Sequence, residues 1–206
     1  VNLINCWEED IAVEPGTPKP ESGKASLDSL LAAARDLKAG LLDGIVTAPI
    51  DKDNIQSEEF KFPGHTEFLT SYFDATDSLM LLVSDDLRVA TVTGHIPVKE
   101  VAGKLNFDLL IRKITILQES LRRDFGILKP RIAVLGLNPH AGEKGLLGTE
   151  ETEIIRPAVM HLKDKGHLVF GPYPADGFFG MRMYKQFDAV LSMYHDQGLI
   201  DRKSVV

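Results

Sequence analysis

The stretch RIAVLGLNPHAG, residues 131–142, decides the fold class. It opens with an aliphatic run that is too short for a helix, which predicts a β-strand over 131–137. The turn signal Asn138-Pro139 follows at once and places His140 directly after that strand. In an open α/β sheet ligands bind at the carboxyl ends of the strands, so the stretch predicts a strand that delivers a histidine to a ligand site.

The rest of the chain repeats this organisation. Similar short apolar runs, each ended by glycine, proline or a polar turn, predict strands at 44–49, 79–83, 88–93, 167–170 and 188–193. Helical spacing of apolar residues predicts helices over 27–37, 68–72, 107–121 and 150–165. Pro157 predicts a break or a late start in the last of these helices, and its early glutamates suit a positive first turn. Strands that alternate with helices predict an α/β fold, with a largely parallel sheet and helices on both faces.

Bulk properties narrow the class of protein. With 206 residues, the chain suits one large domain or two small lobes that share a core. A net charge of −7 argues against broad nucleic-acid binding, which needs a basic face. No apolar run approaches the ~18–20 residues of a membrane helix, and the acidic start does not resemble a signal peptide. Because Cys6 is the single cysteine, we expect a reducing, cytoplasmic environment.

Three histidines occupy equivalent places in this scheme. His95, His140 and His195 each come just after a predicted strand, so they can converge at one edge of the sheet. Neutral imidazole is the commonest ligand for borderline metals, and three protein ligands leave a position free for substrate. The sequence therefore predicts a catalytic site for one divalent cation. His161 and His167 lack this placement and are interpreted as structural or solvent-facing.

Other polar residues are candidates around that site. Asp176 or Asp196 could orient a metal ligand or join the ligand set. His65 and Thr66 precede a predicted helix, where free N–H groups favour a phosphate or carboxylate. A simple N-cap by Thr66 is the more common reason for such a residue.

A glycine-rich loop follows His140. Gly142, Gly145 and Gly148 could let a cofactor or substrate approach the backbone closely. The G-x-G-x-x-G fingerprint of dinucleotide-binding folds is absent from the chain, so the loop alone identifies no cofactor.

Five motifs together resemble one family. They are TAPIDK (47–52), FPGHTEFL (62–69), LNPHAGE (137–143) with Gly145 and Gly148, GPYPAD (171–176) and SMYHDQG (192–198). In order and spacing they resemble the 4-hydroxythreonine-4-phosphate dehydrogenases of vitamin B6 biosynthesis, over about residues 1–203.

The resemblance implies a two-lobed α/β/α architecture like that of isocitrate and isopropylmalate dehydrogenases. The chain would then be a partial catalytic region, 1–206, which spans the cleft between two lobes and has no independent second domain. It also implies a homodimer whose metal site takes histidines from both subunits. The metal ligands would be His95, His140 and His195, and the substrate contacts would be His65, Thr66 and Lys203.

The implied reaction oxidises the secondary hydroxyl of 4-phosphohydroxy-L-threonine with NAD or NADP, and the product then loses carbon dioxide. Zinc, magnesium, manganese and cobalt all fit the metal site. Relative to the family, the chain is expected to be short at both ends, and its last residues, 201–206, depart from the usual continuation.

Three alternatives remain open from the sequence. A related dehydrogenase could act on phosphorylated threonate or erythronate, or on an aromatic cis-diol. A metal-dependent hydrolase could use Asp176 or Glu143 as its base. The chain could also be an inactive fragment that keeps the metal site.

Overall fold

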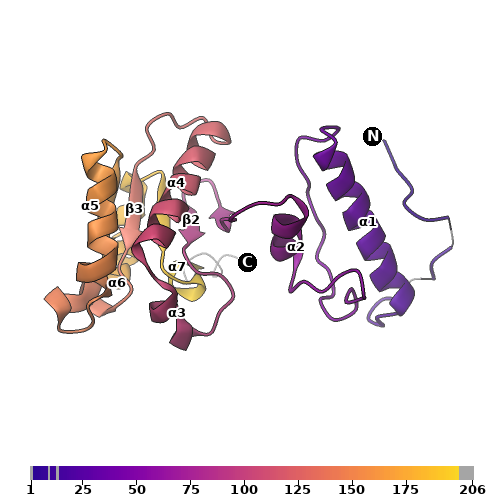
Figure 1. The fold of residues 1–206 in the computed structure, drawn as a ribbon, viewed down its shortest axis with the longest axis horizontal. Helices are drawn as coiled ribbons and strands as arrows, with labels where there is room; N and C mark the ends of the chain where they lie inside the picture. The colour runs from indigo at the N-terminus through magenta and orange to yellow at the C-terminus, as the bar shows by residue number, and fades with distance from the viewer. Residues whose placement is uncertain (1, 9, 13, 200–206) are drawn as a thin grey trace. The chain divides into compact units, whose positions relative to one another are not determined.

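The computed structural model describes residues 2–8, 10–12 and 14–199, and the chain divides into two compact units, 1–78 and 79–206 (Figure 1). The first unit contains two helices, α1 (Pro20–Lys38) and α2 (His65–Tyr72). The second contains strands β1 (Leu81–Val83), β2 (Arg88–Thr91), β3 (Ile132–Leu135), β4 (Val169–Tyr173) and β5 (Ala189–Ser192). Its helices are α3 (Val98–Lys104), α4 (Phe107–Arg123), α5 (Arg156–Asp164), α6 (Ala175–Gly180) and α7 (His195–Leu199), with short turns η1 (Pro139–Gly145), η2 (Glu151–Ile155) and η3 (Met183–Gln186).

The second unit is built on one five-stranded sheet. Its strand order is β1-β2-β5-β3-β4, and only β1 is antiparallel to its neighbour. The strand that comes last in the sequence, β5, therefore lies between β2 and β3. This order brings the ends of β2, β5 and β3 together at one edge.

Alternating side chains fill both faces of the sheet. On one face, Ala90, Val134 and Leu191 belong to a core that includes Leu110 and Ile114 of α4. On the opposite face, residues from the same strands pack with Phe178 of α6 and Leu199 of α7. On the first of these faces α4 and α5 contact each other. The α/β class and the largely parallel sheet with helices on both faces, both predicted from the sequence, are confirmed.

The first unit has its own core. Leu27, Leu30 and Ala34 lie on one face of α1 and pack with Phe60 and Phe68. The Phe60 and Phe68 rings are 5.5 Å apart between centroids, close enough for a favourable aromatic pair. Burial of these side chains fixes α2 against α1.

The predicted strand at 44–49 is wrong. Within the described part of the chain these residues join no strand, and Val46 is fully exposed. A strand needs a neighbour to accept and donate its ladder hydrogen bonds, and Pro49 has no N–H to offer. The apolar pattern indicated strand propensity but could not supply the partner.

The helix expected over 150–165 is present, and it is irregular where Pro157 predicted a break. Glu150 is already helical, residues Glu151–Ile155 form a π turn, and the α-helical segment α5 follows from Arg156. The Arg156 N–H donates to the Glu151 carbonyl, five residues back, and Pro157 follows with no N–H to donate. In the part of the chain that the structure describes, no helix has the length and apolar character to cross a membrane.

Candidate functional site

The three predicted histidines follow three neighbouring strands of the sheet. His95 comes after β2, His195 after β5 and His140 after β3, and β5 pairs with both of the others. Because these strands are parallel, their carboxyl ends lie at one edge. The sheet order therefore places all three histidines at the same edge.

Two of these histidines lie close together. The rings of His95 and His195 are 5.5 Å apart between centroids and tilted by 43°. At that separation one nitrogen of each ring can reach a common cation at the usual metal–nitrogen distance of about 2.0–2.1 Å. The Oδ1 atom of Asp196 lies 2.6 Å from Nδ1 of His195, so Nε2 is the nitrogen left to bind an ion. Imidazole nitrogen is a ligand type that suits a divalent metal.

His140 lines a neighbouring pocket of about 510 Å³. Asp176 and Asp196 line the same pocket, together with Asn138 and Tyr194. Across residues 2–8, 10–12 and 14–199, no three histidine, cysteine, aspartate or glutamate side chains are grouped closely enough to hold a metal ion. One chain thus brings two of the predicted ligands together and leaves His140 beside them.

The loop that carries His140 has an unusual backbone. Residues 140–144 all have left-handed conformations, with φ between 43° and 79°. Such backbone costs roughly 1–2 kcal/mol for each residue that carries a Cβ, and only Gly142 in this turn lacks one. Strain of this kind persists only where the surroundings enforce it, and it clusters at functional sites.

Two glycines of this loop lie against side chains of the protein itself. A Cβ on Gly142 would lie 2.6 Å from Oε2 of Glu151, and one on Gly148 would overlap the Asn138 amide. Side chains of the protein itself therefore fill the space next to these two glycines. The approach of a cofactor or substrate to the backbone of this loop stays a prediction. Gly145 has φ of +97° and open space around it.

The predicted substrate pair lies in the first unit. His65 is the first residue of α2, and Thr66 is exposed in its first turn. The N-cap is Gly64, so the simple capping role for Thr66 is wrong. His65 instead lines a small pocket formed by α1 and residues 45–50. Lys203 lies outside the described residues.

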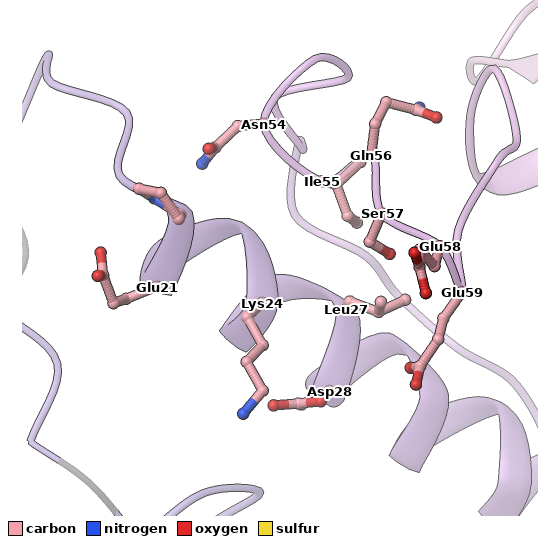
Figure 2. A pocket seen from close by; sticks show the side chains of 11 residues that line it. Glu21, Lys24, Leu27, Asp28, Asn54, Ile55, Gln56, Ser57, Glu58 and Glu59 are labelled. Atoms are coloured by element: carbon pink, nitrogen blue, oxygen red, sulfur yellow. The ribbon is translucent and has the colours of Figure 1, made fainter.

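A separate hollow in the first unit contains none of the predicted site residues. Figure 2 shows it between one face of α1 and the loop 54–59. Its volume is about 530 Å³. Its charged lining residues are four acids and one base: Glu21, Asp28, Glu58, Glu59 and Lys24. A phosphate ester would meet mainly like charge there, so we do not assign this hollow to a phosphorylated substrate.

Two residues that organise the edge were not singled out from the sequence. The Gln197 side chain accepts a hydrogen bond from the Met193 N–H at 2.7 Å and donates one to the Gly136 carbonyl at 2.6 Å, which ties the end of β5 to that of β3. Glu151 is one of the early glutamates of the helix predicted over 150–165, and it is fully buried. Its helical spacing to the buried Ile155, Ala158 and Leu162 was the signal that it faces inward.

These features define a class: an open, mostly parallel α/β protein with histidines gathered at the carboxyl edge of its sheet. A family model described as pyridoxal phosphate biosynthetic protein PdxA matches residues 1–206. The chain belongs to this family.

Similar proteins carry a more specific name. The chain is 50% identical to a 4-hydroxythreonine-4-phosphate dehydrogenase of Bacteroides thetaiotaomicron over 206 residues, covering all of this chain and 57% of that protein. A crystal structure of the Klebsiella pneumoniae 4-hydroxythreonine-4-phosphate dehydrogenase matches with a TM-score of 0.84 at 37% identity, over 94% of this chain and 58% of that one. A terephthalate 1,2-cis-dihydrodiol dehydrogenase from Burkholderia xenovorans matches with a TM-score of 0.71 at 30% identity, over 94% and 61%. The chain thus spans less than two thirds of the length of these relatives.

Proposed function

We propose that this protein takes part in the oxidation of 4-phosphohydroxy-L-threonine by NAD or NADP, followed by decarboxylation to 3-amino-2-oxopropyl phosphate, a step of vitamin B6 biosynthesis. One observation carries the proposal. A chain of this family gathers His95, His140 and His195 at the ends of three adjacent strands, and two of their rings are in contact.

We assign the three histidines to a divalent cation, with zinc, magnesium, manganese and cobalt as the candidates. When bound, the cation would lower the pKa of the substrate hydroxyl and offset the negative charge that develops during decarboxylation. Asp196 would keep the proton of His195 on Nδ1, so that Nε2 faces the cation. Asp176 would act as a further polar group near the substrate, and its position in the lining of the His140 pocket supports this role.

His65, Thr66 and Lys203 are the proposed substrate contacts. His65 and Thr66 lie at the start of α2, where free backbone N–H groups and the helix dipole favour an anionic group. Donors of this kind suit the phosphate and carboxylate of the substrate in an acidic protein. The NAD or NADP site is not assigned to particular residues.

We further propose that the protein is a homodimer with a shared metal site. His95 and His195 are close within one chain, whereas the described residues of that chain do not group three ligands. A second copy could complete the set with its His140. We propose that residues 1–206 are the partial catalytic region at the cleft between the two lobes.

A second candidate has structural support. The terephthalate dihydrodiol dehydrogenase matches 94% of this chain, so oxidation of an aromatic cis-diol is an alternative within the same architecture. The acidic hollow in Figure 2 does not discriminate between the two substrates, because none of the predicted ligands or substrate contacts lines it. Turnover with each substrate in parallel discriminates between them.

The test is the reduction of NAD or NADP by the purified protein, followed by the absorbance of the reduced nicotinamide. 4-Phosphohydroxy-L-threonine and a cis-dihydrodiol are each supplied with and without added metal. We expect metal-dependent reduction with the phosphorylated substrate, and a loss on the order of 100-fold or more in His140→Ala. His161→Ala is the matched control, because His161 packs against Phe107 on an exposed face.

Faster turnover of the cis-diol would replace the first proposal with the second. Because the chain covers 57% of its Bacteroides relative, the same assay is run on a version that carries that relative's flanking segments. If neither version reduces the nicotinamide with any substrate, the dehydrogenase proposal is wrong.

A further inference from the structure

A buried carboxylate lies beneath the loop that carries His140. The Glu151 side chain is fully buried, and its oxygens accept hydrogen bonds from that loop. Oε1 accepts from the backbone N–H groups of Leu137 and Asn138, each at 2.7 Å, and Oε2 accepts from the Asn138 side-chain amide at 2.9 Å. Three donors of this kind offset much of the cost of burying a charged group.

Glu151 meets the chain just before the left-handed turn and again in the middle of it. Leu137 and Asn138 lead from β3 into the turn, and Gly142 lies in the middle of it. A Cβ on Gly136 would come within 3.0 Å of Oε1 of Glu151, and one on Gly142 within 2.6 Å of Oε2. The carboxylate therefore occupies the space that two glycines leave open, before and after His140.

Glu151 is itself held by a rigid element. It begins the π turn that continues into α5, and Ile155, Ala158 and Leu162 anchor that segment in the core. Single π turns within helices are frequent at functional sites, because they re-aim a side chain without breaking the helix. The Glu151 side chain thus links the His140 loop to α5, which is fixed in the core.

We propose that Glu151 is the positioning residue for His140. It holds residues 137–142, which lead into the left-handed turn, and so sets where the imidazole lies at the sheet edge. The inference deepens the proposed function and rests on it, because the position of His140 matters most if that residue binds the cation. Glu151 itself touches neither the cation nor the substrate.

The experiment compares four single variants. Glu151→Ala removes all three acceptor contacts. Glu151→Gln keeps the volume and one oxygen for the two backbone N–H groups, but turns an NH₂ group toward the Asn138 amide. Ile155→Ala removes a buried side chain from the same π turn without touching the loop, and Glu153→Gln alters an exposed carboxylate in that turn.

Two quantities are measured in each variant. The first is the affinity for Co²⁺ or Zn²⁺, by competition with a chelator. We expect Glu151→Ala to weaken it by about 10–100-fold, Glu151→Gln to fall between it and the wild type, and both controls to stay within about twofold. The second is amide hydrogen exchange at Leu137 and Asn138, which we expect to accelerate in Glu151→Ala while exchange in β3 is unchanged.

The two measurements separate this proposal from the proposed function. If Ile155→Ala weakens metal binding as much as Glu151→Ala does, the effect is general destabilisation and the proposal is overturned. Unchanged exchange at Leu137 and Asn138 in Glu151→Ala also overturns it. A wild-type protein that binds neither metal contradicts the proposed metal site, and hydrogen exchange then still decides whether Glu151 holds the turn. If Glu151→Ala does not fold, Glu151→Gln carries both measurements.

Discussion

Asp196 is a largely solvent-exposed residue with one close contact, to the ring of His195. Its carboxylate is 85% exposed and meets Nδ1 of His195 at 2.6 Å. As a surface ion pair this contact would contribute little to stability, about 0–1 kcal/mol. If His195 binds a metal as proposed, Asp196 fixes the tautomer of that ligand and affects metal binding more than folding.

We therefore predict that Asp196→Asn weakens Zn²⁺ binding by about 10-fold while the free energy of unfolding changes by less than about 1 kcal/mol. Chelator competition and urea denaturation measure the two quantities. Asp164→Asn, an exposed carboxylate at the end of α5, is the control. Equal metal affinities in the two variants would show that Asp196 has no such role.

The glycines after His140 allow a second prediction at the residue scale. Gly142 and Gly145 both have positive φ, but only Gly142 has neighbours where a Cβ would go. We expect Gly145→Ala to destabilise by about 1 kcal/mol through its backbone alone, and Gly142→Ala by a further 1–3 kcal/mol or so through overlap with Glu151. Urea denaturation measures both, and similar losses would mean that the loop relaxes freely around Glu151.

Sequence reasoning located the histidines better than it described their surroundings. His95, His140 and His195 could be placed at one edge because each follows a short apolar run, and strand ends are a local property. The left-handed turn at 140–144 could not be predicted, because alanine, glutamate and lysine, which occupy three of its positions, rarely adopt that backbone. Its cause, Glu151, is distant in sequence and acts through tertiary contact.

At the scale of elements, Gln197 joins two strands beyond the point where their ladder ends. The last paired residues of β3 and β5 are Val134 and Leu191, and the Gln197 side chain then spans from Met193 to Gly136. The amide replaces the hydrogen bonds that the diverging backbones no longer make. It thereby keeps the loops of His140 and His195 at a fixed separation.

We predict that Gln197→Glu destabilises the protein by about 1–3 kcal/mol. The new carboxylate keeps an acceptor for the Met193 N–H but sets an oxygen against the Gly136 carbonyl, which is left without its donor. Gln186→Glu makes the same chemical change on an exposed turn and serves as the control. Matching unfolding free energies for the two variants would contradict the bridging role.

A short apolar run formed a strand only where neighbouring strands were present to pair with it. The run in β3 could be predicted because it is aliphatic throughout, as a strand covered on both faces must be. The run at 44–49 has the same local character but joins no strand among the described residues. Strand propensity is therefore a local quantity, whereas a strand itself exists only in pairs.

At the scale of the whole molecule, the arrangement of the histidines predicts which inactive variants can rescue each other. If His95 and His195 act from one chain and His140 from its partner, a hybrid dimer of His140→Ala and His195→Ala chains contains one intact site. After random reassembly of the two chains, about a quarter of the sites would be intact, since half of the dimers are hybrids with one good site each.

The matched mixture is His95→Ala with His195→Ala. In this mixture no chain carries both His95 and His195. No hybrid dimer can therefore form an intact site, and we expect no recovery. Dehydrogenase activity and bound Zn²⁺ per chain are measured in each mixture after unfolding and refolding together. Recovery in both mixtures, or in neither, would contradict the shared site in this form.

The unpaired run at 44–49 has a consequence for the behaviour of the protein at high concentration. A β-branched segment with free backbone donors and acceptors is a template for strand pairing between molecules, which leads to aggregation. Val46, whose side chain is fully exposed, lies within that segment. We expect Val46→Lys to raise the concentration at which light scattering appears, because charge on an open edge blocks such pairing, whereas Val98→Lys on the exposed face of α3 should not. Residues 44–49 would then set the concentration above which the protein aggregates.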